Sequence, residues 1–92
     1  MNEPYEDVSI KYPAINNHFF RTFKHDINPQ DLVWHRDRNH RTIRVIEGQK
    51  WYLQFDNELP IVLEVGKEYH IPKEQYHRII KGGGNLVLEI KE

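Results

Sequence analysis

The chain has 92 residues, which is enough for one domain with a single core and excludes two separate cores. It contains no cysteine, so disulfide frameworks and thiolate metal sites are excluded. The 13 basic and 14 acidic residues leave a formal charge of −1, so we expect neither a nucleic-acid nor a membrane partner. No apolar run is long enough for a transmembrane helix or a signal peptide, and we expect a cytoplasmic protein.

The N-terminal segment, residues 1–17, differs from the rest of the chain. It is polar, contains Pro4 and Pro13, and carries three acids and no base before Val8. Segments of this kind rarely contribute to a core. We therefore predict a flexible arm or one added strand over 1–17, and a folded domain over 18–92.

From His18 onward, apolar and polar side chains alternate with a period of two, and the helical period never persists beyond one turn. Turn residues separate nearly every pair of segments, and Gly82-Gly83-Gly84 is predicted to be a flexible hairpin turn. Strands are predicted over His18–Lys24, Asp31–Asp37, Arg41–Glu47, Lys50–Phe55, Pro60–Val65, Glu68–Ile71, Tyr76–Ile80 and Leu86–Lys91. Short strands at about ten-residue spacing, with no helix between them, are typical of an all-β sandwich or barrel.

The alternation also predicts which side chains point inward. The inward candidates are the odd-numbered residues of two predicted strands: Arg41, Ile43, Val45, Trp51, Leu53 and Phe55. The same parity places His35 and Asp37 on the inward face and brings Arg41 to them. An inward polar group costs several kcal/mol unless it is paired, bound to a metal or hydrated. The cluster therefore indicates either a metal or small-ligand pocket, or an internal Asp37–Arg41 salt bridge.

Two stretches of the chain resemble the motifs of the cupin superfamily, G-x5-H-x-H-x3,4-E-x6-G and G-x5-P-x-G-x2-H-x3-N. The matching positions are His35, Gly48, Gly66, Pro72 and His77. The sequence departs from the motifs at Pro29 and Glu74 (glycines in the family), Asp37 (a histidine), Arg41 (the glutamate) and Lys81 (the asparagine). The resemblance covers residue 31 to roughly residue 84.

The resemblance implies a small antiparallel cupin β-barrel, or jelly roll, of about eight or nine strands over 18–92. Cupins commonly dimerise, with the N-terminal segment crossing to the partner. A homodimer is therefore expected, with 1–17 as a swapped strand and with Phe19, Phe20 and Phe23 at the contact.

A metal site is the second implication of the resemblance. The family's three histidines and one glutamate are reduced here to His35, Asp37 and the distant His77. Two histidines and one carboxylate form the ligand set of non-haem Fe(II) oxygenases. We therefore expect a divalent metal, with Fe(II) favoured and Mn, Ni or Zn as alternatives. Arg41 repels such an ion, but it can also hold the anionic group of a substrate.

Four further residues are candidates for the pocket. His40 is an alternative ligand if a turn at Arg38-Asn39 reorients it, and His70 precedes Ile71-Pro72, where it can reach the pocket rim. Trp51 and Phe55 lie on the inward parity of their strand.

Three functions remain open at this stage. The first is a metal-dependent oxygenase, lyase or isomerase acting on a small organic acid. The second is a small-ligand-binding module without turnover. The third is a structural domain in which Asp37 and Arg41 form an internal salt bridge and no metal binds.

Overall fold

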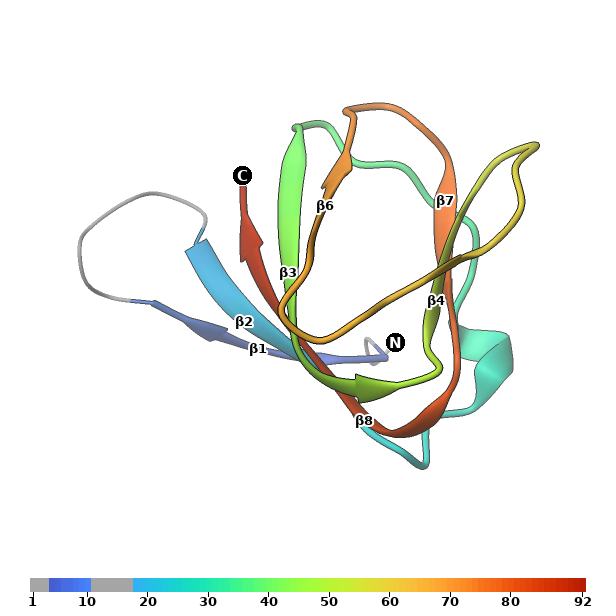
Figure 1. The fold of residues 1–92 in the computed structure, drawn as a ribbon. Helices are drawn as coiled ribbons and strands as arrows, with labels where there is room; N and C mark the ends of the chain where they lie inside the picture. Colours follow the sequence, from blue (N-terminus) through green and yellow to red (C-terminus); the bar gives the residue numbers. More distant parts are fainter. Residues whose placement is uncertain (1–3, 11–17) are drawn as a thin grey trace.

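The computed structural model describes residues 4–10 and 18–92, and its strands form two antiparallel sheets (Figure 1). The eight strands within these residues are β1 (Glu6–Ser9), β2 (His18–Phe23), β3 (Arg41–Gln49), β4 (Tyr52–Phe55), β5 (Ile61–Val62), β6 (Glu68–Ile71), β7 (His77–Ile80) and β8 (Gly83–Lys91). One sheet has the order β1-β2-β8-β3-β6 and the other β5-β4-β7. The predicted all-β jelly roll is confirmed. Within the described ranges, no helix is long and apolar enough to cross a membrane.

The core lies between the two sheets and follows the predicted parity. Ile43 and Val45 on β3 are 1 % exposed, while Trp51 and Leu53 are fully buried. The indole N–H of Trp51 donates a hydrogen bond to the carbonyl of Gly83 (3.1 Å), so burial of this side chain leaves no polar group unpaired. The other buried apolar side chains are Phe23, Phe55, Leu63, Ile71, Ile79, Leu86, Leu88 and Ile90.

The prediction of a strand over Asp31–Asp37 is wrong. A 3-10 turn, η1 (Pro29–Asp31), occupies its start, because Pro29 presets a turn and the Asn28 side chain accepts a hydrogen bond from the Gln30 N–H (3.0 Å). In the rest of this segment only His35 pairs in a ladder, as an isolated antiparallel bridge with His77. That single bridge preserves the inward orientation that the strand prediction had assigned to His35.

The N-terminal segment is only partly described, since residues 1–3 and 11–17 lie outside the described ranges. Strand β1 pairs antiparallel with β2, with Val8 opposite Phe20. In Figure 1 these two strands extend from the barrel at one edge of the larger sheet. All four β1 residues are exposed.

The three consecutive glycines do not form the predicted hairpin turn, because β8 begins at Gly83. Gly82 instead packs against the backbone at the β3–β4 corner. A β-carbon placed on Gly82 would lie 2.3 Å from the carbonyl groups of Gln49 and Lys50, which is far inside van der Waals contact. A β-carbon on Gly83 would come no closer than 3.8 Å to Gln49.

We therefore expect Gly82→Ala to lower the free energy of unfolding by about 2–3 kcal/mol, because the backbone must move to relieve the overlap. Gly83→Ala is the matched control and should change it by less than about 1 kcal/mol. Urea unfolding of the two variants measures the difference. Equal effects of the two substitutions would contradict a close backbone contact at Gly82.

Candidate metal centre

The bridge between His35 and His77 places two imidazoles side by side. Each residue's backbone N–H donates to the other's carbonyl at 2.9 Å. Directly opposed residues of an antiparallel pair project to the same side of the sheet. The ring centroids are accordingly 4.3 Å apart. His77 also lies opposite Phe55 on β4, and these two rings are 6.3 Å apart.

Hydrogen bonds to the backbone set the tautomer of both histidines. The Nδ1 atom of His35 lies 3.1 Å from the Val33 carbonyl, and that of His77 lies 2.9 Å from the Gln75 carbonyl. A carbonyl oxygen can only accept, so Nδ1 carries the proton in each neutral ring. Nε2 is then left with its lone pair, which is the arrangement in which an imidazole binds a metal.

Asp37 completes the cluster with a carboxylate oxygen that no hydrogen bond satisfies. Its side chain is 14 % exposed, and Oδ2 lies 3.4 Å from Nε2 of His77 and 3.5 Å from Nη1 of Arg41. Oδ2 is fully buried, and among the described residues it has no hydrogen-bond partner. An unsatisfied buried acceptor costs about 1–3 kcal/mol, and more when it is charged. Arg41 is an ion-pair neighbour of this oxygen, but the hydrogen-bonding capacity of the oxygen is unused within the described residues.

The three residues fit a divalent ion. One ligand atom from each of His35, Asp37 and His77 lies within 4.8 Å of the other two. Metal bonds to nitrogen and oxygen are about 2.0–2.2 Å long, so neighbouring ligands of one ion lie roughly 3–3.6 Å apart at octahedral or tetrahedral angles. The side chains would therefore have to rotate toward one another to hold one ion. A cation at this position would also satisfy Oδ2 of Asp37.

Arg41 stands beside the cluster but also has a second acidic partner. Its Nε donates to the carboxylate of Glu92, and the side chains of both residues are nearly buried. Glu92 therefore offsets part of the positive charge of Arg41. This pairing reduces the repulsion that an arginine alone would exert on a nearby divalent ion.

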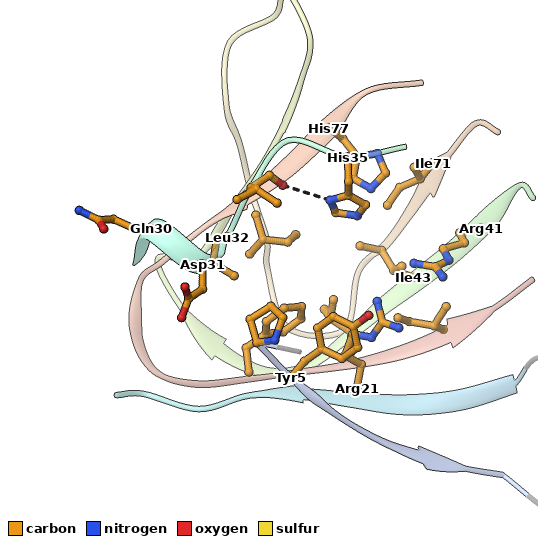
Figure 2. A pocket seen from close by; sticks show the side chains of 16 residues that line it. Tyr5, Arg21, Gln30, Asp31, Leu32, His35, Arg41, Ile43, Ile71 and His77 are labelled. Atoms are coloured by element: carbon orange, nitrogen blue, oxygen red, sulfur yellow. Dashed lines mark hydrogen bonds between the residues drawn. The ribbon is translucent and has the colours of Figure 1, made fainter. Parts of the chain in front are cut away.

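Next to the cluster lies a cavity of about 450 Å³ inside the barrel. His35, His77 and Arg41 contribute to its wall, and in Figure 2 Tyr5 and Arg21 lie on the opposite side. The remaining described lining residues are Pro4, Phe23, Gln30, Asp31, Leu32, Val33, Ile43, Ile71, Ile79, Leu88 and Ile90.

The other predicted pocket residues lie elsewhere in the structure. Trp51 is in the core, and Phe55 contacts the ring of His77 without lining the cavity. His40 and His70 are exposed and stack on each other, with ring centroids 5.5 Å apart. His40 Nδ1 accepts from the Lys73 N–H (3.3 Å), so this ring packs outside the cluster.

Arg21 and Tyr5 are cavity residues that the sequence analysis missed. Arg21 is 8 % exposed, donates from Nε and Nη2 to the Asp7 carboxylate (2.8 and 3.0 Å), and lies 3.6 Å from the centroid of the Tyr5 ring. The alternation rule would have found Arg21, since it shares the odd-numbered face of β2 with Phe19 and Phe23. No sequence signal marks Tyr5.

The motif position occupied by Glu74 has a structural explanation. Glu74 has φ +62°, in the left-handed region that glycine adopts without strain. A glycine, which the cupin motif has at this position, would suit that conformation. Glu74 is held in it by a hydrogen bond from its N–H to the Asp37 carbonyl (2.7 Å). The same hydrogen bond holds the backbone of Asp37, which is a candidate ligand.

The comparisons with known proteins concern the fold. No protein-family model and no curated protein matches the chain. Among solved structures, a cupin-2 domain containing protein from Shewanella frigidimarina is similar, with 23 % identity and a TM-score of 0.69 over 98 % of this chain and 81 % of that one. Fe(II) HppE in complex with substrate gives 18 % identity and a TM-score of 0.65 over 98 % of this chain and 53 % of that one.

A third similar structure is hydroxypropylphosphonic acid epoxidase from S. wedmorenis in complex with fosfomycin. It gives 20 % identity and a TM-score of 0.65 over 94 % of this chain and 48 % of that one. The chain therefore spans about half the length of the epoxidase. Together these likenesses establish a cupin-like fold, and the His-Asp-His cluster within that fold is consistent with a metal site.

Burial lowers the pKa of His77 below its ordinary 6.5 and outweighs the raising effect of the hydrogen bond to the Gln75 carbonyl. Smaller contributions come from His35 and Arg41, which lower the pKa, and from Asp37, which raises it. The unfolded chain binds this proton more readily than the folded one. Stability from neutral His77 is therefore complete above about pH 6.5 and is lost as the pH falls through the folded pKa.

We expect the free energy of unfolding of the wild type, measured by urea titration in EDTA, to approach that of His77→Gln as the pH falls from 7.5 to 5. The exposed His70→Gln variant is the control, and its difference from the wild type should stay nearly constant. A His77→Gln difference that grows toward low pH would mean that the pKa of His77 is raised instead.

Proposed function

We propose that this chain is a metal-dependent cupin-fold protein in which His35, Asp37 and His77 hold a divalent ion. The observation that carries the proposal is the buried, hydrogen-bond-free Oδ2 of Asp37, which lies beside imidazoles whose Nδ1 protons are already used. Three protein ligands leave coordination positions open for a substrate, so the ion would supply Lewis acidity to a group bound there.

Fe(II) is the favoured metal, with Mn, Ni or Zn as alternatives. Iron is favoured because two histidines and one carboxylate are the ligand set of non-haem Fe(II) sites. The other ions are alternatives because such a site accepts most first-row divalent metals, and the supply of each metal in the cell then decides which one binds. The choice of iron is supported by the similarity of the fold to a protein whose structure contains Fe(II), HppE. The proposed reaction class is an oxygenase-type conversion of a small organic acid, or a related lyase or isomerase reaction.

Arg41 has the proposed role of binding the substrate anion. It lines the cavity next to His35 and His77, and its side chain is only 13 % exposed. A guanidinium in such a partly dry wall binds a carboxylate through two parallel hydrogen bonds. Glu92, bonded to Nε, fixes the orientation of the group and leaves the Nη side to face the cluster.

A second candidate function follows from the same Arg41–Asp37 contact of 3.5 Å. If the arginine is the permanent partner of Asp37, the protein is a small-ligand-binding or structural cupin without a metal. The two accounts differ in what the Asp37 charge does for the metal-free protein. In the metal account it is a costly unsatisfied charge, and in the salt-bridge account it stabilises the fold.

Asp37→Asn separates the two accounts. Untagged wild-type protein, incubated anaerobically with Fe(II), Mn, Ni or Zn and then dialysed, should retain close to one ion per chain by ICP-MS. Asp37→Asn should lose at least tenfold in metal affinity. His40→Ala is the matched control and should retain the metal.

The stability of the metal-free proteins supplies the second readout. Asp37→Asn should be as stable as the wild type in EDTA, or more stable, because the neutral amide removes a buried unsatisfied charge. Wild-type protein that stays empty with all four metals, together with an Asp37→Asn variant that is less stable in EDTA, would establish the salt-bridged, metal-free alternative.

We also propose three finer points of organisation, which were expected from the composition of the chain and from the resemblance. These are a homodimer in a cytoplasmic location, with residues 1–17 as a flexible arm or a swapped strand and 18–92 as the barrel. Support for the dimer comes from β1, an exposed edge strand, and from Val8 (66 % exposed) beside Phe20 (36 % exposed). Such an edge is usually paired or covered.

A further inference from the structure

The wall of the barrel cavity is apolar over most of its area. Strands of both sheets contribute inward aliphatic side chains to this wall, and Leu32 adds to the wall from the loop after η1 (Figure 2). The apolar lining residues are Pro4, Phe23, Leu32, Val33, Ile43, Ile71, Ile79, Leu88 and Ile90. A small polar acid held at the cluster would leave nearly all of this surface in contact with water, which is unfavourable.

The charged groups of the cavity indicate where an anion can bind. Arg21 uses both Nε and Nη2 in hydrogen bonds to Asp7 and lies against the Tyr5 ring, so the donor edge that a carboxylate would use is already occupied. Asp31 is exposed at the edge and repels anions. Arg41 also has acidic neighbours, Glu92 at Nε and Asp37 at 3.5 Å from Nη1. Among the described residues only its Nε is engaged in a hydrogen bond, so the Nη groups remain to receive a carboxylate.

The volume sets the size of the ligand. About 450 Å³ is the volume of roughly fifteen water molecules. Acids of two to four carbons fill only a small part of it. A linear chain of about eight to twelve carbons with its carboxylate takes up most of this space, as ligands do in pockets of this size.

We propose that the ligand of this cavity is an amphiphilic monocarboxylate with an aliphatic body of about eight to twelve carbons. Its carboxylate lies at Arg41, and its chain packs on Ile43, Ile79 and Ile90 toward the Tyr5 side. The placement of the carboxylate next to the metal cluster rests on the proposed function, whereas the apolar body rests on the cavity wall alone.

Calorimetric titration with butyrate, hexanoate, octanoate, decanoate and succinate tests the chain-length dependence directly. Each added CH2 should tighten binding by up to about fourfold, so that decanoate binds at least tenfold more tightly than butyrate. Succinate, which carries more charge and no apolar tail, should bind no better than butyrate. The titrations are run on Mn(II)-loaded and on EDTA-treated protein.

Leu32→Asn gives a matched pair with Leu59→Asn. Leu32 lines the cavity in a loop, where a polar side chain is less disruptive than in a strand, whereas Leu59 is 86 % exposed and lies outside the cavity lining. Leu32→Asn should weaken decanoate binding at least fivefold and leave butyrate binding and Mn(II) content unchanged. Leu59→Asn should leave all three unchanged.

The outcomes separate the two proposals. If decanoate binds more tightly than butyrate to protein that has taken up Mn(II), the result supports both the metal function and the ligand class. If the same chain-length dependence is found but the protein takes up no Mn(II), the result supports the ligand class and overturns the metal function. Equal affinity for butyrate and decanoate, or tighter binding of succinate, overturns the ligand class whatever the metal content. Decanoate binding that Leu32→Asn leaves intact places the tail outside the cavity and also overturns it.

Discussion

The candidate site depends on one pair of backbone hydrogen bonds, between His35 and His77. The segment that carries His35 has no strand of its own, and this bridge is its only ladder contact among the described residues. The bridge turns both imidazoles to the same side, and the carbonyls of Val33 and Gln75 then fix both tautomers. His35 therefore has the orientation that it would have in a strand, although the segment around it is irregular.

The electrostatics of Asp37 are the reason for proposing a metal here rather than a salt-bridged network. A network built for stability satisfies all its members, because a half-satisfied one is worse than apolar packing. Here Asp37 faces a nearly buried His77 and an arginine that is already bonded to Glu92, and its Oδ2 remains without a hydrogen bond in the described part of the chain. Arg41 therefore stands beside the cluster as the cation that, in the proposed function, receives the charge of the substrate.

The two-residue alternation predicted most of the fold because each strand has one buried face: Ile43, Val45, Trp51 and Leu53 all point inward as expected. The alternation failed at Pro29, where a 3-10 turn replaces the start of a predicted strand. The turn signal failed at Gly82, where glycine permits a close backbone contact and does not form a hairpin turn. The grouping of His35 and Asp37 was predictable because parity survives a single bridge, whereas His77 was placed with them by the resemblance to the cupin motifs. The positions of His40 and Tyr5 were not, since loop conformation and the course of the N-terminal strand leave no periodic signal.

The central claim is that Asp37, His35 and His77 share one divalent ion. The most direct measurement is anomalous scattering from a crystal grown with Mn(II) or Fe(II), recorded above and below the absorption edge of the metal. The account predicts one strong peak within about 2.3 Å of both Nε2 atoms and of an Asp37 carboxylate oxygen. A well-ordered cluster with no such peak, in which the Arg41 guanidinium is hydrogen-bonded to Oδ2 of Asp37, would contradict it.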